Sequence, residues 1–317
     1  MGLKLLEKIR RHASIASGNF GALFEGAEIP PLPAAAARLV QEINRPEPDI
    51  AYTTKLISVS PELAAKVIQT INSSLYSLRS PVLSIRHAIS LMGIKHLRPI
   101  VLAYTLRSAI PSPTGGLFHR DGFWSDSLLR ATLGHALARR VRPGEEDSAF
   151  TAILIADLAL PVLLEHWSEY YEPVVALWRK TDHRLANIEQ AHFHWDHAQA
   201  GAWILQSWQF PDELVCLVGL HHRDPDELVE HDLADTLAPV LTAVTRVPSC
   251  LRPDIGHARS FREAVCAAFD LPPAVVTESI EDARASFEEL RQIFDLPPAL
   301  TDEVWRALDA ASEEPAA

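Results

Sequence analysis

The helical period of the apolar residues is the feature that most constrains the fold of this 317-residue chain. Apolar side chains recur three or four residues apart along most of the sequence, whereas the two-residue alternation of half-buried strands is nearly absent. The stretch 32–43 is the first clear case, with apolar residues at positions i, i+4, i+7, i+8 and i+11. We therefore expect an all-α protein built from amphipathic helices.

Residues with known preferences for helix ends mark where several of these helices begin and stop. Ser60, Pro61 and Glu62 supply an N-cap, a proline at the first helical position and an acidic residue in the first turn. Another helix begins after Ser84 and ends at Gly93, since glycine tolerates the positive φ that is common there. Further helices are predicted over residues 95–107, 123–141, 147–166, 169–180, 187–208 and 212–222.

A run of helix-breaking residues between Ile110 and Gly122 divides the helical part of the chain. We expect it to separate two halves of one module, at about residues 22–110 and 120–224. Residues 1–21 are predicted to form a helical extension, because charged residues interrupt any continuous apolar signal segment there.

The C-terminal part of the chain contains a short repeat. The sequence Phe-Asp-Leu-Pro-Pro-Ala occurs at 269–274 and again at 294–299, each time after an amphipathic segment. We interpret each copy as a point where one helix stops and the next starts. Residues 225–310 are therefore predicted to form an additional helical subdomain, followed by a disordered tail at 311–317.

The composition argues for a soluble protein that does not bind bulk nucleic acid. The 41 acidic residues outnumber the 29 basic ones, for a net charge of −12, whereas phosphate-backbone binding depends on Lys and Arg. The longest apolar stretch, 151–164, is interrupted by Asp157 and Pro161 and is shorter than the ~20 residues of a membrane-spanning helix, so no membrane span is predicted. Three cysteines without metal-ligand spacing are typical of reduced thiols, and we expect a cytoplasmic protein.

Sequence motifs for nucleophilic or nucleotide-dependent catalysis are absent. The chain has no Gly-x-Ser-x-Gly elbow, no Walker loop and no dinucleotide fingerprint. His194 and His197, at positions i and i+3, could share a helix face near His192, but their spacing matches no closed zinc pattern. Because Phe193 and Trp195 alternate with these histidines, an aromatic packing surface is the favoured interpretation and a metal site the alternative.

Several motifs occur in a fixed order along the chain. They are Ile-Pro-Pro-Leu-Pro at 29–33, the stretches 57–68, 71–76 and 84–93, Phe-Trp-Ser-Asp-Ser at 123–127, Leu-Ile-Ala-Asp-Leu at 154–158, the stretch 197–208 and His221-His222. This series resembles the HDOD domain, the HD-related output domain of bacterial signalling proteins. The resemblance covers about residues 22–224 and implies two packed helical bundles, with a degenerate HD-type fold in the second half.

In HD phosphohydrolases, histidine and aspartate side chains hold metal ions that activate water. The resemblance implies that this ligand set is depleted here. Three ligand positions carry other residues: Asp126 at the first histidine, Ala156 at the histidine of the His-Asp pair, and Val244 in the region of the later aspartate. The residues that remain are Asp157 and a residual cleft of His197, His221 and His222. We therefore expect no bound metal, no cofactor and no catalysis.

Asp157 is the remaining carboxylate of that set and lies in an otherwise apolar segment. It follows Ile153 by four residues and Leu154 by three, which places it on the buried side of a helix. An unpaired buried charge costs several kcal/mol, so Asp157 must have a partner. We expect that partner to be one of the three cleft histidines or a group of backbone amides.

The pattern favours a noncatalytic signalling module that binds a signalling protein or a small ligand, with a homodimer as a further expectation. A rival is a phosphohydrolase with a rearranged site of Asp126, Asp157, His197 and His222, because carboxylates can replace histidines for hard metals. A third alternative is a cyclic-dinucleotide receptor, which requires arginines around a pocket. The candidates in the first half are Arg79, Arg86, Arg98 and Arg107.

Overall fold

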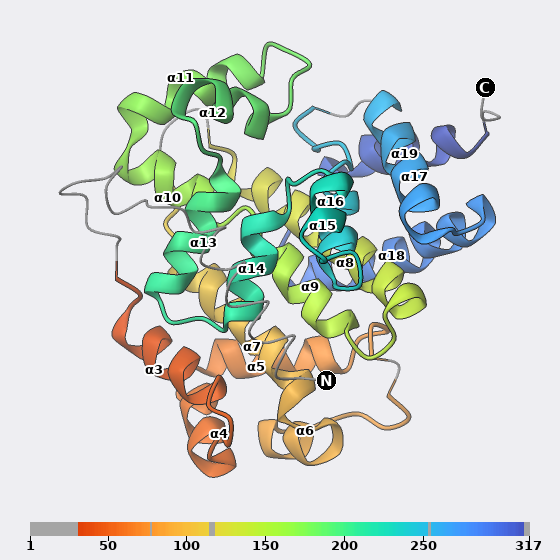
Figure 1. The fold of residues 1–317 in the computed structure, drawn as a ribbon. Helices are drawn as coiled ribbons and strands as arrows, with labels where there is room; N and C mark the ends of the chain where they lie inside the picture. Colours follow the sequence, from red (N-terminus) through yellow and green to blue (C-terminus); the bar gives the residue numbers. More distant parts are fainter. Residues whose placement is uncertain (1–30, 77, 114–117, 253–254, 314–317) are drawn as a thin grey trace.

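The computed structural model describes residues 31–76, 78–113, 118–252 and 255–313, and the regular elements in these ranges are helices (Figure 1). The strand-like pairing found there is one isolated bridge between Ser249 and Arg252. The expectation of an all-α fold is thus confirmed. The extension predicted at 1–21 lies outside the described residues.

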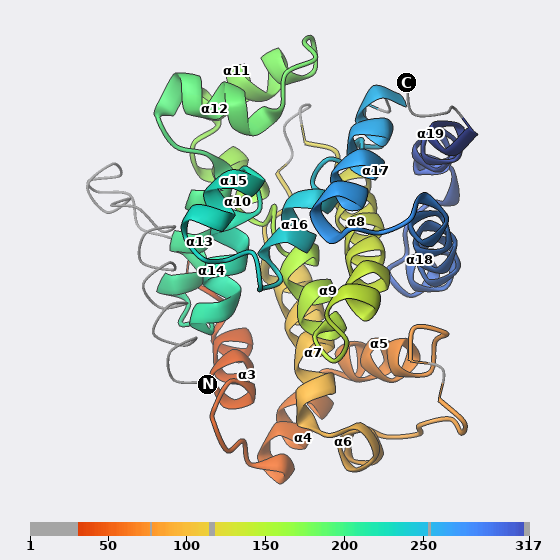
Figure 2. The same cartoon turned by 45° about the vertical axis from the view of Figure 1, so that its right-hand side comes forward.

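Five helices form the N-terminal bundle: α3 (Ala34–Ile43), α4 (Ile50–Ser58), α5 (Pro61–Ile71), α6 (Ile85–Met92) and α7 (Ile94–Ala109). Helix α7 contacts α3, α5 and α6, so the bundle is organised around it (Figure 2). The predicted helix ends are confirmed here. Ser60 Oγ accepts the N–H of Leu63, Ser84 Oγ accepts the N–H of His87, and Gly93 has a φ of 82°.

Helix α8 (Arg120–Val141) is the central element of the remaining part of the molecule. It is buried almost without interruption from Trp124 to Ala138, because α9 (Glu146–Leu154), α16 (Ala238–Val244) and α18 (Pro273–Ile293) pack around it. At Gly134 the backbones of α8 and α9 come close, since a Cβ atom there would lie 1.9 Å from Cδ1 of Ile153. A larger residue at this position would therefore require the Ile153 side chain to move, or the two helices to shift.

The prediction of one continuous helix over 147–166 is wrong. Helix α9 ends at Leu154, residues 155–158 form a turn, and α10 (Ala159–His166) begins after it. The physical reason is Pro161, which has no N–H and whose ring would clash with the carbonyl of Asp157 in a continuous helix. Asp157 therefore lies in the turn between two helices and not on a helix face.

The prediction of one helix over 187–208 is also wrong. Helix α11 (Ser168–Trp178) is followed by α12 (Leu185–Phe193), which ends where His194 takes a left-handed φ of 61°. Helix α13 (His197–Ser207) then begins at a capping box, in which Asp196 accepts the N–H of Gln199 and the Gln199 side chain accepts the N–H of Asp196. This capping signal places His197 at the start of a new helix.

The apolar stretch formed by α9, the following turn and α10 belongs to the core. By length and composition, residues 146–166 could cross a membrane, but 78% of their most apolar window is buried inside the folded chain. Burial of this kind is typical of a core segment in a soluble protein.

The remaining helices are α14 (Asp212–Leu220), α15 (Pro225–Glu230), α17 (Ile255–Phe269), the short 3₁₀ turn Pro298–Leu300 and α19 (Asp302–Glu313). Helix α19 thus includes residues 311–313 of the expected tail, and 314–317 lie outside the described residues. Figure 2 shows α18 running beside α8, so the C-terminal helices cover one side of the central helix.

Both copies of the Phe-Asp-Leu-Pro-Pro repeat end one helix and start the next, as the sequence predicts. In each copy the aspartate is left-handed, with a φ of 50° at Asp270 and 52° at Asp295. The leucine N–H then bonds to a carbonyl five residues earlier, which is the Schellman pattern of a helix end. The second copy also contacts the N-terminal bundle, because Lys66 Nζ donates to the carbonyl of Ile293 and to Asp295.

Candidate functional site

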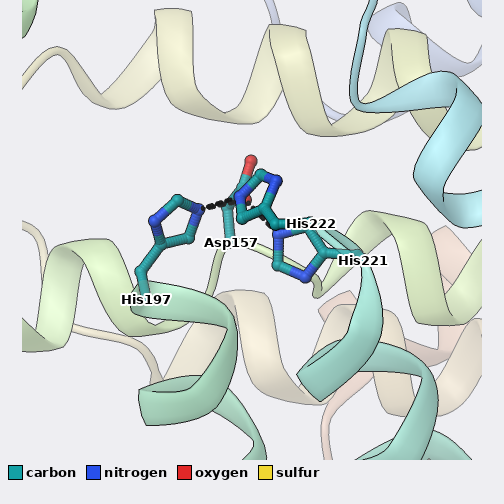
Figure 3. Close-up of side chains that lie close together, drawn as sticks. All are labelled: Asp157, His197, His221 and His222. Carbon is teal, nitrogen blue, oxygen red and sulfur yellow. Dashed lines mark hydrogen bonds and ion pairs between the residues drawn. The ribbon is translucent and has the colours of Figure 1, made fainter. Parts of the chain in front are cut away.

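Four side chains from separate segments converge behind the central helix: Asp157, His197, His221 and His222 (Figure 3). Asp157 comes from the α9–α10 turn, His197 from the first turn of α13, and the two adjacent histidines from the residues that follow α14. One ligand atom of each lies within 4.8 Å of the others. The structure thus brings together the four remaining residues of the set that the sequence singled out.

Asp157 is held by three cationic or potentially cationic partners. Its Oδ2 accepts from Arg130 Nη1 at 3.1 Å, and its Oδ1 lies 3.2 Å from His197 Nε2 and 3.2 Å from His221 Nε2. Burial by itself would raise the pKa of Asp157, but the contacts with His197, His221 and Arg130 hold that pKa well below its usual range. Asp157 is therefore ionised and paired at neutral pH.

His197 lies between two carboxylates. Its Nδ1 is 2.6 Å from Glu189 Oε2, and its backbone N–H donates to the same oxygen at 2.9 Å. Burial lowers the pKa of His197, but Glu189 and Asp157 outweigh burial and raise that pKa to about 10. Glu189 is itself fully buried and also accepts from the Tyr171 hydroxyl, and burial raises the pKa of its carboxyl against the opposing effect of His197. His197 is the protonated partner of this pair.

The two adjacent histidines have different proton arrangements. His221 Nδ1 donates to the carbonyl of Val218 at 2.6 Å. Its other ring nitrogen, Nε2, faces Asp157, but the angle between them is not that of a hydrogen bond. Arg184 Nη2 lies 3.1 Å from His222 Nδ1, and because a guanidinium can only donate, this nitrogen accepts. Burial, with the charges of His221, His197 and Arg184, holds the pKa of His222 well below its usual range, so this ring is neutral. Its proton is then on Nε2.

The cluster has the donor set for one metal ion. Two imidazole Nε2 atoms, from His197 and His221, and one oxygen of Asp157 point to a common region. Both histidines have their other ring nitrogen fixed, by Glu189 and by the Val218 carbonyl, as metal-binding histidines usually do. The side chain of Arg130 beside Asp157 opposes this, because its permanent charge repels a cation.

The three substituted positions add no ligand to the cluster. Asp126 is engaged elsewhere, since it accepts from Ser249 Oγ at 2.5 Å and from the Cys250 N–H at 2.7 Å. Burial raises the pKa of its carboxyl despite these contacts and the nearby Arg130. Ala156 is buried and has no donor atom. Val244 is fully buried as well, and the neighbouring Thr245, which sequence reasoning did not single out, lines the cavity in its place.

The cluster forms part of the floor of a cavity of about 200 Å³. Asp157, His197, His222 and Thr245 contribute to the floor, together with the guanidinium groups of Arg130, Arg184 and Arg246. Apolar side chains make up much of the remaining lining, namely Phe118, Phe123, Leu160, Leu164, Val175, Trp178 and Leu251, and the further polar ones include His119, Arg252, His257 and Ser260. Of these polar groups, sequence reasoning missed the arginines, which carry no motif and lie far apart along the chain.

Two of the predicted groupings are not found. His192 and His194 are exposed, while His197 points into the cluster, so the three do not form a metal site. The aromatic interpretation of that segment is confirmed, because Phe193 stacks on Tyr171 and Trp195. The four arginines proposed for a cyclic dinucleotide do not line the cavity. Among them, Arg107 instead donates to the Phe294 carbonyl and stacks over the rings of Trp124 and Phe294.

A family model described as HDOD domain matches residues 29–224. The chain belongs to the HDOD family. An uncharacterized protein from Treponema pallidum is 19% identical to this HDOD protein over 204 residues, a match that covers 62% of the chain but 38% of that protein. The chain thus spans well under half the length of this curated relative.

Solved structures confirm the fold of this HDOD protein. One from Shewanella amazonensis, named "Putative phosphohydrolase", has a TM-score of 0.69 at 20% identity and covers 87% of this chain and 99% of that one. An HDOD domain protein of unknown function from Geobacter sulfurreducens has a TM-score of 0.65 at 18% identity, covering 92% of this chain and 99% of that one. A "Putative signal transduction protein" from Marinobacter aquaeolei has a TM-score of 0.59 at 17% identity, covering 90% of this chain and 64% of that one.

Proposed function

We propose that this HDOD protein is a noncatalytic signal-transduction module, whose degenerate HD-type cavity receives a ligand and whose surface reports that state to a signalling partner. The contact between Arg130 and Asp157 carries the proposal. A guanidinium is always positive, and at 3.1 Å it already neutralises the carboxylate that a metal ion would require. Ala156 offers no ligand atom beside it. An internal cation thus occupies the carboxylate that the HD-type pattern would assign to a metal.

His197 supplies a second internal cation. With a pKa raised to about 10 by Glu189 and Asp157 against the effect of burial, its ring is an imidazolium at neutral pH. A metal ion would have to displace the proton on Nε2 and also approach Arg130. Both requirements weaken metal binding, and they support a site that holds its shape through its own charges.

Metal analysis of the natively purified chain tests this proposal. We expect well under one metal ion per chain and no hydrolysis of bis(4-nitrophenyl) phosphate or of cyclic dinucleotides. The Arg130→Gln variant should take up more metal than wild type, because the competing charge is gone. Stoichiometric metal in wild type, with turnover that is lost in Asp157→Asn, would overturn the noncatalytic function.

A single-ion hydrolase is the second candidate, and one contact in the cluster favours it. His222 Nε2 lies 2.8 Å from His197 Nε2, and Arg184 places the His222 proton between them. His197 Nε2 should then accept from His222, yet Asp157 beside it requires a donor. An ion on Asp157, His197 and His221 would satisfy the Asp157 oxygen without a proton on His197 Nε2, and it would supply Lewis acidity toward a phosphoryl or carbonyl oxygen.

Calorimetric titration with Zn²⁺ and with Mn²⁺ separates the two candidates. The single-ion site requires one ion per chain and loss of binding in His221→Ala. The exposed His87 is a matched control, and His87→Ala should leave the titration unchanged. Weak binding that is equal in wild type and His221→Ala excludes the hydrolase and leaves the noncatalytic module.

A further inference from the structure

Positive charge in the cavity exceeds the acid available to balance it. Arg130, Arg184, Arg246 and Arg252 line the cavity, and the acids among the described lining residues are Asp126 and Asp157. Arg252 donates to main-chain carbonyls, those of Trp178, Thr181 and His183. Asp157 is already bonded to Arg130. Burial raises the pKa of Asp126 toward its neutral form, although its own hydrogen bonds and Arg130 oppose this. The charges of Arg184 and Arg246 therefore have no matching carboxylate within the described lining.

Arg184 and Arg246 repel each other inside this cavity. Arg184 donates to two neutral groups, His222 Nδ1 at 3.1 Å and Thr245 Oγ1 at 3.2 Å. Burial lowers the pKa of Arg184 and the nearby charge of Arg246 lowers it further, and these effects outweigh the opposing charges of Asp224 and Asp196, which lie outside the cavity lining. Like charges of this kind are relieved by an anion bound between them, and guanidinium groups bind phosphate and carboxylate oxygens in pairs.

The rest of the cavity suits an apolar body of limited size. Leu160, Leu164, Val175, Trp178 and Leu251 form walls beside the charged floor. The volume of about 200 Å³ is below the roughly 300–1,000 Å³ of pockets for drug-sized ligands. A body with one small ring fits this space better than the two nucleotides of a cyclic dinucleotide.

We propose that the cavity binds a small organic anion, with its phosphate or carboxylate group on Arg184 and Arg246 and its apolar body along Trp178 and Leu160. This inference rests on the proposed function and names the chemical class of the ligand. A phosphate ester should bind more tightly than a carboxylate, because its greater charge matches an excess of more than one positive charge on the floor.

Calorimetry on the full chain with three probes of similar size tests the inference. Phenyl phosphate and phenylacetate carry the anionic group, whereas benzyl alcohol is neutral. We expect at least one of the anions to bind one per chain, and benzyl alcohol to bind roughly tenfold more weakly or not at all. Arg246→Gln should weaken anion binding roughly tenfold or more, because it removes a charged donor. Arg86→Gln, on an exposed position of α6, is the matched control and should change nothing.

A second variant separates the two parts of the site. Leu251 lines the cavity and is 38% exposed, so Leu251→Gln should fold and should weaken phenyl phosphate while leaving inorganic phosphate unchanged. The inference is overturned if neither anion binds, if benzyl alcohol binds as tightly as the anions, or if Arg246→Gln binds them as wild type does. Hydrolysis of phenyl phosphate would instead overturn the noncatalytic function, because it leaves the anion site in place.

Discussion

Removing the Glu189 carboxylate should destabilise the fold more than any surface change. Glu189 is 0% exposed and accepts from three donors: the backbone N–H of His197, the Nδ1–H of His197 and the hydroxyl of Tyr171. In Glu189→Ala these donors are left buried without an acceptor, and each such loss costs about 1–3 kcal/mol. Because the imidazolium also loses a buried counter-charge, we expect a total loss of about 3–5 kcal/mol.

Thermal unfolding followed by far-UV circular dichroism measures this loss. For a chain of this size, about 3–5 kcal/mol corresponds to a fall in Tm of about 4–8 °C. Glu189→Gln keeps the volume and one acceptor oxygen, so its fall should be smaller. Glu288, whose side chain is 45% exposed, forms an i, i+3 pair with Arg291, and Glu288→Ala should change stability by less than about 0.5 kcal/mol.

One melting result would contradict a paired Glu189 carboxylate. A Tm of Glu189→Ala within about 2 °C of wild type, and so similar to the Glu288→Ala control, would refute the assignment of a paired buried carboxylate. The double variant Glu189→Ala, His197→Ala adds a check. Its loss should be smaller than the sum of the two single losses, because the second substitution removes the imidazolium that the first leaves unpaired.

Further predictions concern the packing at Gly134, the hydrogen bonds of Asp126 and the titration of His135. Gly134→Val should lower stability by about 1–3 kcal/mol or more, since its side chain meets Ile153, and chemical denaturation should show it. Asp126→Ala leaves Ser249 Oγ and the Cys250 N–H without their acceptor and should cost about 1–3 kcal/mol in the same assay, whereas no change would contradict the described hydrogen bonds. Burial lowers the pKa of His135 although Asp147 opposes it, so the folded ring is neutral and stability should fall as pH drops below about 6.5. His135→Gln should flatten that acid-side slope in melts from pH 7 to pH 5, and an unchanged slope would show that His135 does not contribute.

How far the site could be predicted from the sequence depends on whether a residue acts through local pattern or through distant contacts. The expectation that Asp157 requires a partner is confirmed, but the helix face inferred from its spacing to Ile153 and Leu154 is wrong, because Asp157 lies in a turn. The turn around it follows from Pro161, whose clash with the Asp157 carbonyl was the decisive local signal. A helical period alone does not reveal such a break, because the apolar residues continue on both sides of it.

Glu189 and Arg130 mark the limit of sequence reasoning. Glu189 lies four residues after Leu185 on an apolar helix face, which indicates burial, but its partner His197 lies beyond a helix end. Arg130 pairs with Asp157 across 27 residues of sequence. No spacing rule links such residues, because their proximity is produced by the packing of α8 against the α9–α10 turn.

The joint between the N-terminal bundle and the C-terminal helices combines side-chain contacts with two main-chain acceptors at a helix end. Lys66 binds the carbonyl of Ile293 as well as Asp295, and Arg107 binds the carbonyl of Phe294. Every residue type presents a carbonyl, so these two cations recognise the shape of a helix end more than the identity of its side chains. The Phe294 ring adds a contact that does depend on the side chain, because it is buried against Tyr104 and under Arg107, so Phe294→Ala should weaken the joint even if the turn forms. Insertion of a single residue there would move both carbonyls and separate the two parts of the protein.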